Sequence, residues 1–291
     1  MIRRTTHFCS ATLTASVVGG YIHSVTHVQN EGAQIFWRES GEGPPLLLIM
    51  GLGYTSDMWY RIEPAFAESH RTIMFDNRGV GQSDIPPGPY SISSMASDAG
   101  AVLDAAGLGS AHVFGVSLGG YIAQEFALTY PERVRSLTLG CTGTGGSEGV
   151  LAEPQVVDAL LARKDMTPEE GSRHLVPYIY DESTSPHRVE EDLAVRVRTF
   201  PSPQGYQAQL DGVSAWEGSF GRLGQLTMPV QILHGEHDQL VPPQNAQILN
   251  ESISGSTLLP LPDASHIIWT DQPERVIHAV AALIRDVEEA G

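Results

Sequence analysis

Lysine is almost missing from this 291-residue sequence, in which Lys164 is the only one. Lysine and arginine together number 17, against 34 aspartates and glutamates, and the formal net charge is −17. A surface with this charge repels phosphate backbones and anionic lipids, and the sequence contains no basic stripe that would bind them. We therefore predict that the protein binds neither nucleic acid nor a membrane, and that it uses no Schiff-base lysine.

Cysteine is also scarce, since the sequence has only Cys9 and Cys141. The two lie far apart and form no C-x-x-C motif, which argues against a disulfide-stabilised fold and against a zinc knuckle. Long apolar runs are missing as well, because none reaches the ~20 residues of a membrane-spanning helix. These absences leave an ordinary globular composition, with 41% hydrophobic residues.

The N-terminus superficially resembles a secretion signal, because Arg3 and Arg4 precede the stretch TTHFCSATLTASVVGG. Threonines and serines interrupt its apolar residues, however, and no clear cleavage site follows. We expect a cytoplasmic protein, with export as the weaker alternative, and a poorly ordered N-terminal arm over residues 1–26.

Apolar segments alternate with helical segments from residue 27 onward. A hairpin is predicted over HVQNEGAQIFWRES (27–40), with its turn at Asn30-Glu31-Gly32. Short runs without polar alternation then follow, as expected for strands buried on both faces: LLLIMG (46–51), RTIMFDNRG (71–79), AHVFGVS (111–117), VRSLTLG (134–140) and MPVQILHG (228–235). Helical patterns between them include 55–69 and 91–108. This alternation predicts an α/β fold whose parallel sheet is covered on both sides.

The alternation stops over residues 145–222, which contain helical segments but no convincing buried strand. This stretch is acidic and interrupted by prolines. We therefore predict a core domain made of residues 27–144 and 223–291, with residues 145–222 inserted as a helical cap.

Ser117 lies between Gly115 and Gly119, where a predicted strand meets a predicted helix. In a G-x-S-x-G turn only small neighbours avoid clashes, and the serine hydroxyl points away from the sheet. The turn also places the N–H of Leu118 at a helix N-terminus, where positive partial charge collects. The alternative is an ordinary turn with incidental glycines, because the motif alone is short.

Two further residues follow strands in the way that a serine nucleophile requires. Asp238 comes after the strand VQILHG, and His266 comes after the strand STLLPL. A serine hydroxyl needs a base to accept its proton, and the base needs an acid to hold it in the right tautomer. The chain order Ser117, Asp238, His266 therefore predicts a catalytic triad. The developing oxyanion needs donors too, for which the candidates are the N–H groups of Leu118 and, in the loop MGLGY, of Leu52.

Together these motifs resemble those of the α/β-hydrolase-fold serine hydrolases, especially the esterase branch that includes the 3-oxoadipate enol-lactonase-like proteins. The resemblance rests on MGLG, FDNRGVGQSD, GVSLGG, HGEHDQLVPP and DASH and covers roughly residues 27–290. It implies a mostly parallel sheet of eight strands flanked by helices, with a cap inserted after the sixth strand. It also implies that Ser117 is the nucleophile, Asp238 the acid and His266 the base, with no cofactor.

The sequence departs from the family pattern at two places. Met50 stands where a histidine often precedes the oxyanion glycine, and Ala264-Ser265 stands where a glycine often precedes the catalytic histidine. Neither departure removes a catalytic group. Serine rather than aspartate at position 117 argues against the epoxide-hydrolase and haloalkane-dehalogenase relatives.

Other clusters have simpler interpretations. The stretch HGEH (234–237), together with Asp238, could suggest metal ligands. It is not an H-E-x-x-H motif on a helix, however, and ligands crowded at the end of a strand cannot all face one ion. We therefore predict no metal site. Asp76 and Arg78 are predicted to hold the loop after their strand. The glycine-rich stretches 143–146 and 79–81 lack a phosphate-binding motif.

We predict an enzyme that hydrolyses a carboxylic ester or a lactone of a small molecule through an acyl-enzyme, with water as the second substrate. The same triad could serve carbon–carbon bond hydrolysis, perhydrolysis or cyclisation, and a ligand-sensing receptor of the same fold is a further alternative. Candidates for the substrate pocket are Gly51, Tyr54, Trp216 and Trp269, although each aromatic residue is equally compatible with core packing. The sequence carries no signal for an oligomeric state.

Overall fold

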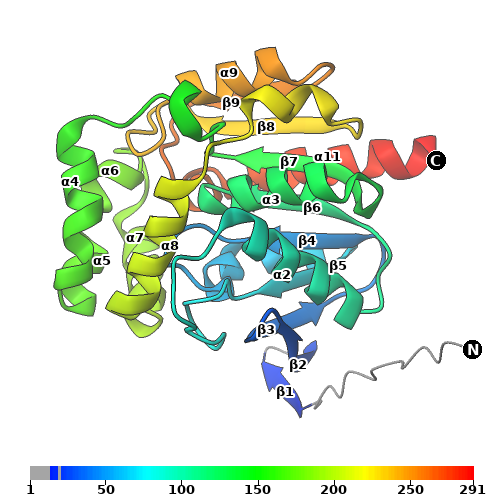
Figure 1. Ribbon diagram of the computed structural model, residues 1–291, viewed down its shortest axis with the longest axis horizontal. Helices are drawn as coiled ribbons and strands as arrows, with labels where there is room; N and C mark the ends of the chain where they lie inside the picture. Colours follow the sequence, from blue (N-terminus) through cyan, green and yellow to red (C-terminus); the bar gives the residue numbers. More distant parts are fainter. Residues whose placement is uncertain (1–13, 19–20) are drawn as a thin grey trace, which may run out of the picture.

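One mixed sheet of nine strands forms the centre of the molecule in a computed structural model, which describes residues 14–18 and 21–291 (Figure 1). The strand order is β1-β2-β3-β5-β4-β6-β7-β8-β9. The strands are β1 (Thr14–Val18), β2 (Tyr21–Asn30), β3 (Ala33–Ser40), β4 (Pro45–Ile49), β5 (Arg71–Phe75), β6 (Ala111–Val116), β7 (Val134–Gly140), β8 (Val230–Gly235) and β9 (Thr257–Leu261).

Most of the sheet is parallel, as predicted. The neighbours β5-β4-β6-β7-β8-β9 all pair in parallel, whereas β1, β2 and β3 form an antiparallel edge that joins the sheet through β5. Strands β2 to β9 make up the eight predicted strands, and β1 is an addition. The hairpin turn is where the sequence places it, with Glu31 (φ 44°) and Gly32 (φ 82°) in the left-handed region between paired Asn30 and Ala33.

The antiparallel edge begins earlier than the sequence analysis expects. Residues 14–18 and 21–26, which fall in the predicted N-terminal arm, pair as strands with each other and with β3. Their valines, threonines, isoleucine and tyrosine favour extended backbone, which is the physical reason that these residues form strands. The rest of the predicted arm, 1–13 and 19–20, lies outside the described residues.

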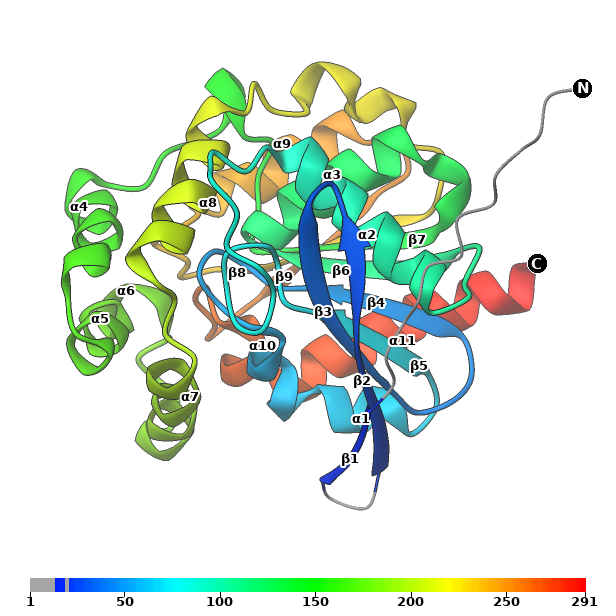
Figure 2. The ribbon, with the colours of Figure 1, turned by 60° about the horizontal axis from the view of Figure 1, so that its bottom comes forward.

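Helices cover both faces of the sheet (Figure 2). One face packs against α2 (Ile92–Ala105), α3 (Leu118–Thr129) and α9 (Gln244–Ser252), and the other against α1 (Glu63–Ala67), α10 (Ile268–Asp271) and α11 (Pro273–Ala290). The sequence of β4 is wholly apolar because helices cover both of its faces. Leu47 and Ile49 face the first layer, Leu46 and Leu48 face the second, and each is at most 1% exposed.

The predicted helix over 55–69 is divided into two elements. A 3-10 helix, η1 (Ser56–Arg61), is followed by its C-cap residue Ile62, and α1 starts at Glu63 with Pro64 in its first turn. Proline has no N–H to donate to a preceding turn, so it fits the start of a helix and interrupts its interior.

The cap is helical, as predicted. It is inserted in the sequence between β7 and β8, and it lies at one end of the sheet, on the left in Figure 1. Its helices are α4 (Pro154–Ala162), α5 (Pro168–His174), α6 (Val176–Ile179), α7 (Pro186–Arg198) and α8 (Pro203–Ala215). All five have a proline in the first turn, which explains the proline punctuation of the sequence. Of the helices in the described part of the chain, none is long and apolar enough to cross a membrane.

Candidate active site

Ser117 occupies a strained turn between β6 and α3. Its backbone has φ 55° and ψ −122°, a conformation that residues other than glycine rarely adopt. A Cβ atom on Gly115 would lie 2.2 Å from the Gly119 carbonyl oxygen, and one on Gly119 would lie 2.1 Å from the Ile49 carbonyl oxygen. Both positions therefore need glycine, and the turn is packed tightly against the end of β4.

The loop that follows β4 lies directly beside this serine. A Cβ atom on Gly51 would be 3.1 Å from the Ser117 Cβ and 3.6 Å from its Oγ. The next N–H in this loop belongs to Leu52, and the N–H of Leu118 opens α3, where the first amides have no acceptor within the helix. The two amides predicted to bind the oxyanion thus belong to segments that meet at Ser117.

Two buried side chains hold this loop in place. The Nδ2 of Asn77 donates to the Met50 carbonyl oxygen (2.8 Å), and the N–H of Gly53 donates to Oε1 of Gln209 (2.9 Å). Gln209 belongs to cap helix α8, so the cap contributes directly to the loop geometry. Neither contact was found from the sequence, because an asparagine or a glutamine in a polar segment carries no signal for so distant a partner.

Asp238 and His266 meet at the carboxyl ends of β8 and β9. The His266 Nδ1 lies 2.8 Å from Oδ2 of Asp238, and both residues are at most 4% exposed. Oδ1 of the same carboxylate accepts the N–H groups of Leu240 (2.9 Å) and Val241 (2.8 Å). Because the carboxylate accepts from Nδ1, the proton of a neutral His266 sits on Nδ1 and leaves Nε2 free to act as a base.

The charge state of Asp238 follows from its surroundings. Burial alone would raise the pKa of this carboxyl, but the charges and hydrogen bonds of His266 and His234 outweigh burial and hold the pKa well below its usual range. Asp238 is therefore a carboxylate at neutral pH, as a residue that orients and stabilises a histidine must be.

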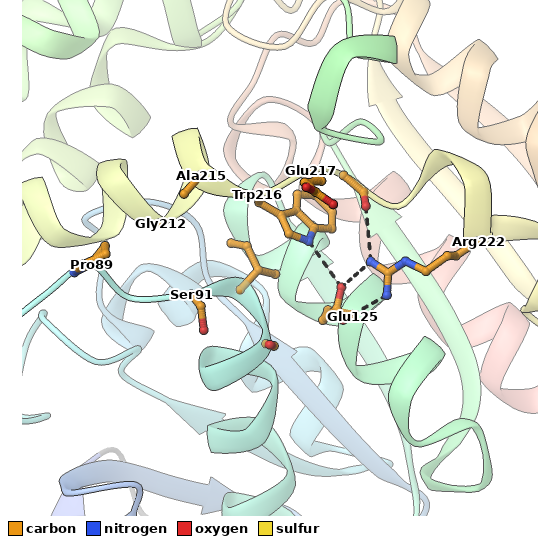
Figure 3. A pocket seen from close by; sticks show the side chains of 11 residues that line it. Pro89, Ser91, Glu125, Gly212, Ala215, Trp216, Glu217 and Arg222 are labelled. Carbon is orange, nitrogen blue, oxygen red and sulfur yellow. Dashed lines mark hydrogen bonds and ion pairs between the residues drawn. The ribbon is translucent and has the colours of Figure 1, made fainter.

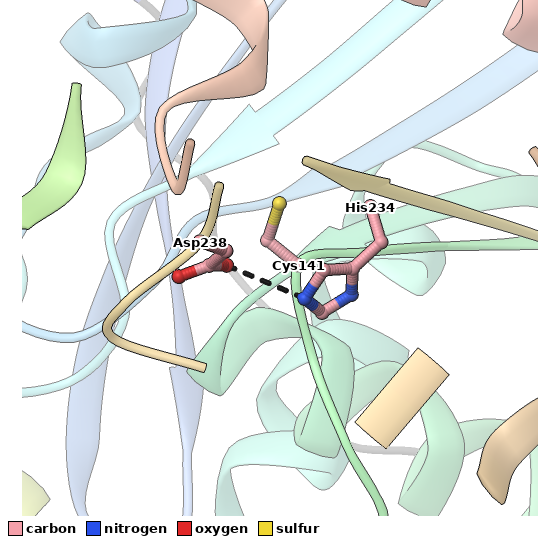
Figure 4. Close-up of side chains that lie close together, drawn as sticks. All are labelled: Cys141, His234 and Asp238. Atoms are coloured by element: carbon pink, nitrogen blue, oxygen red, sulfur yellow. Dashed lines mark ion pairs between the residues drawn. The ribbon is translucent and has the colours of Figure 1, made fainter. Parts of the chain in front are cut away.

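Asp238 also belongs to a second cluster, in which the side chains of Cys141, His234 and Asp238 approach one another (Figure 4). The His234 Nε2 lies 2.8 Å from the Val241 carbonyl oxygen and 3.4 Å from Oδ2 of Asp238. A carbonyl only accepts, so Nε2 carries a proton and is not available to a metal. Burial raises the pKa of the Cys141 thiol, which keeps it neutral. These contacts favour a hydrogen-bonded support for Asp238 over a metal site.

Ser117 and His266 open into one cavity of about 160 Å³ between the core and the cap. The predicted pocket residues Gly51, Tyr54 and Trp269 line it, and so does Leu52. The remaining lining residues are Leu118, Tyr121, Leu160, Arg163, Leu175, Ile179, Leu210, Val213, Leu240 and Val241. Apart from the catalytic candidates, the tyrosine hydroxyls and Arg163, the wall of this cavity is apolar.

Trp216 does not line this cavity, in contrast to the sequence-based prediction. It stacks on Tyr121 with 4.9 Å between ring centroids, and its Nε1 lies 3.3 Å from Oε2 of Glu125. It borders a separate depression with Arg222, which pairs with Glu125 (Figure 3). Trp216 directly follows α8, and its ring packs against Tyr121 and Glu125, both on α3.

Asp76 and Arg78 make the contacts of structural residues. The two carboxylate oxygens of Asp76 accept the N–H groups of Ser56 (2.8 Å) and Gln82 (2.9 Å). Arg78 forms two hydrogen bonds of 2.7 Å with the buried carboxylate of Asp98. They fix the loop after β5, as predicted, and contact none of the triad candidates.

Comparisons with known proteins agree with this fold. The sequence profile of the alpha/beta hydrolase fold matches residues 44–273. RutD of Azorhizobium caulinodans, named as a candidate carbamate hydrolase, is 32% identical over 83% of this chain and 91% of its own. 3-Oxoadipate enol-lactonase 2 of Acinetobacter baylyi is 29% identical over 83% and 89%. Among solved structures, a thermophilic esterase from Thermogutta terrifontis with malate bound has a TM-score of 0.79 at 26% identity, covering 91% of this chain and 99% of that one.

Proposed function

Since the chain belongs to the alpha/beta hydrolase fold family, we propose that it is a serine hydrolase that cleaves a carboxylic ester or a lactone of a small molecule. The observation that carries this proposal is the Asp238–His266 hydrogen bond of 2.8 Å at the edge of a cavity that Ser117 also lines. The family relatives named as an esterase and an enol-lactonase support the same class of substrate.

The proposed reaction begins when Oγ of Ser117 attacks the carbonyl carbon and Nε2 of His266 takes its proton. The carboxylate of Asp238 stabilises the imidazolium that forms. The N–H groups of Leu52, in the loop after β4, and Leu118, at the start of α3, hold the negative oxygen of the tetrahedral intermediate. His266 then gives its proton to the leaving alcohol, which in a lactone remains attached to the acyl group.

The second half of the reaction uses water. His266 removes a proton from a water molecule as the water attacks the acyl-serine, and the acid is released when Oγ takes the proton back. The apolar wall of the cavity strengthens each of these electrostatic contacts by excluding bulk solvent. A cavity of about 160 Å³ accommodates a group of about the size of benzene, so the proposed substrates are small.

The test combines covalent labelling with turnover. Ser117→Ala should abolish labelling by a fluorophosphonate and lower kcat on p-nitrophenyl esters by at least about 10³-fold. Ser93→Ala, which changes an exposed serine on α2, is the matched control and should behave as the wild type. Continued labelling of Ser117→Ala would overturn the assignment of the nucleophile. Labelling of Ser117 without turnover of any ester or lactone would instead favour the carbon–carbon, perhydrolase, cyclase or receptor alternatives.

A further inference from the structure

Arg163 brings a positive charge from the cap to the catalytic cavity. It begins the short 3-10 helix η4 (Arg163–Asp165) that follows α4, and its side chain lines the same cavity as Ser117 and His266. The residue is only 2% exposed. Of the residues that line this cavity, it is the only arginine or lysine, and no aspartate or glutamate is among them.

Aromatic rings surround the guanidinium of Arg163, and no carboxylate of the described residues forms an ion pair with it. Its Cζ lies 5.1 Å from the ring centre of Tyr54, 5.0 Å from that of Phe200 and 5.3 Å from that of Tyr206. Nε donates to the Gly171 carbonyl oxygen (3.2 Å), whereas the buried Nη2 has no hydrogen-bond acceptor within the described part of the chain. The site therefore holds a charge by cation–π contacts and leaves donor capacity unused.

The other buried arginines show what is unusual here. Arg78 is satisfied by the carboxylate of Asp98 at 2.7 Å. Arg196, which also stacks on Tyr54 at 5.2 Å, has no carboxylate within 4 Å among the described residues, but it does not line the cavity. Only Arg163 combines an unpaired, buried guanidinium with a position on the wall of the catalytic cavity.

A buried cation with an unused donor is unfavourable unless something compensates for its lost hydration. Aromatic faces compensate in part, because they attract the charge without accepting an in-plane hydrogen bond. A carboxylate would complete the site, since its two oxygens match the guanidinium fork and the resulting pair is charge-assisted. The small volume of the cavity favours a carboxylate over a bulkier anion.

We propose that Arg163 binds a carboxylate of the substrate, so that the enzyme acts on small esters or lactones that carry a free acid group. This inference rests on the proposed serine-hydrolase function and names its substrate class. Charge-assisted hydrogen bonds to arginine change binding by roughly 10- to 100-fold. The enzyme should prefer a charged ester over its neutral analogue by a factor in that range.

Two pairs of esters test the preference on either side of the scissile bond. Monomethyl glutarate carries its carboxylate on the acyl side, and methyl pentanoate has a methyl group in its place. The acetate ester of γ-hydroxybutyrate carries the carboxylate on the alcohol side, and butyl acetate is its neutral analogue. In at least one pair, the wild type should show a charged-to-neutral ratio of kcat/KM of roughly 10 or more.

Arg163→Met should reduce that ratio about 10-fold or more, and Arg163→Lys, which keeps the charge without the fork, should reduce it less. Arg196→Met is the matched control, because it removes an equally buried arginine that also contacts the Tyr54 ring but does not line the cavity, and it should leave the ratio unchanged. A ratio near 1 in the wild type for both pairs, or a ratio that Arg163→Met does not change, would overturn the proposal while leaving ester hydrolysis intact.

Binding gives a readout that needs no turnover. In a Ser117→Ala background, the two carboxylate esters should raise the Tm more than their neutral analogues, and the added Arg163→Met change should abolish the difference. The same measurement on Ser117→Ala alone tests the subsite even if the Arg163 variants fail to fold. Equal Tm shifts by charged and neutral esters would contradict the subsite, whereas a charge-dependent shift without wild-type turnover would support the subsite and count against the proposed hydrolysis.

Discussion

Gln209 on cap helix α8 accepts a hydrogen bond from the N–H of Gly53, at 2.9 Å, in the loop that carries Leu52. The other end of the same amide donates to the Arg78 carbonyl oxygen (2.9 Å), and the side chain is fully buried. One residue of the cap thus joins the loop after β4 to the loop after β5, next to the proposed oxyanion donors.

Gln209→Met should therefore lower kcat more than it changes KM. Methionine fills a similar volume but accepts no comparable hydrogen bond, so the Gly53 N–H loses its partner and the neighbouring N–H of Leu52 loses its fixed position. Complete loss of one oxyanion donor costs about 10²- to 10³-fold in kcat, so we expect a decrease of roughly 10-fold or more within that limit. Steady-state kinetics on a neutral ester measure it.

Gln204→Met is the control, because Gln204 lies on the same helix with an exposed side chain. It should keep the wild-type kcat. A Gln209→Met enzyme with normal kcat and a normal Tm would show that the hydrogen bond to Gly53 does not position the loop.

The stability of the protein should depend on pH through Asp271. This buried carboxyl accepts the hydroxyl of Thr184, a cap residue (2.6 Å), and the N–H of Ser265 (2.8 Å), yet burial raises its pKa to about 6. The folded state then holds a proton that the unfolded chain releases near pH 4. The free energy of unfolding should decrease as the pH rises from about 4 to about 6, by at most roughly 3 kcal/mol, and then level off.

Asp271→Asn should flatten this part of the pH profile, because asparagine keeps an oxygen for the Ser265 N–H and does not titrate. Urea unfolding of both proteins at several pH values between 4 and 8 measures the difference. If the two profiles run parallel over this range, Asp271 does not carry the raised pKa in the folded protein.

The cap should be held less firmly at higher pH, because protonated His237 forms a contact with Asp181 that is lost when His237 loses its proton. His237 lies in the loop after β8, Asp181 follows cap helix α6, and their side chains form an ion pair. The hydrogen bond that protonated His237 donates to the carboxylate of Asp181 raises the pKa of His237 above 6.5, with the negative charges of Asp263 and Glu236 adding to the effect. The contribution of this pair is complete below the ordinary histidine pKa and is lost as the pH rises through the raised one.

Hydrogen exchange over residues 176–183, corrected for its intrinsic pH dependence, should therefore show faster opening at pH 8.5 than at pH 5.5. His237→Gln should remove most of that difference. His187→Gln, which changes an exposed cap histidine beside Glu191, should leave it in place. Equal opening rates at the two pH values in the wild type would rule out a pH-dependent contact.

The fold and the positions of the triad candidates were predictable because both depend on local patterns. Wholly apolar runs mark strands covered on two sides, and parallel strands end at one edge of the sheet. Residues in the loops after β6, β8 and β9 were therefore expected to lie near one another, and Ser117, Asp238 and His266 do line or border one site.

The cap contacts were not predictable in the same way. Arg163 sits in the polar stretch ARKD, a pattern typical of an exposed helix end, and nothing local indicates three aromatic rings from three other segments. Gln209 meets a partner 156 residues away. Trp216 does not line the catalytic cavity, and the reason is related. The direction of a side chain beyond the end of a helix depends on tertiary packing, which the periodicity of the sequence does not describe.

The cap lines the catalytic cavity and, through Gln209, also holds the loop after β4. These two roles have a consequence for attempts to change which substrates the protein recognises. Exchanging residues 154–215 for the corresponding insertion of a relative would alter selectivity and reaction rate at once, because the grafted segment would also have to supply a buried amide at the place of Gln209. Chimeras that retain this glutamine should tolerate far more variation elsewhere in the insertion than chimeras that replace it.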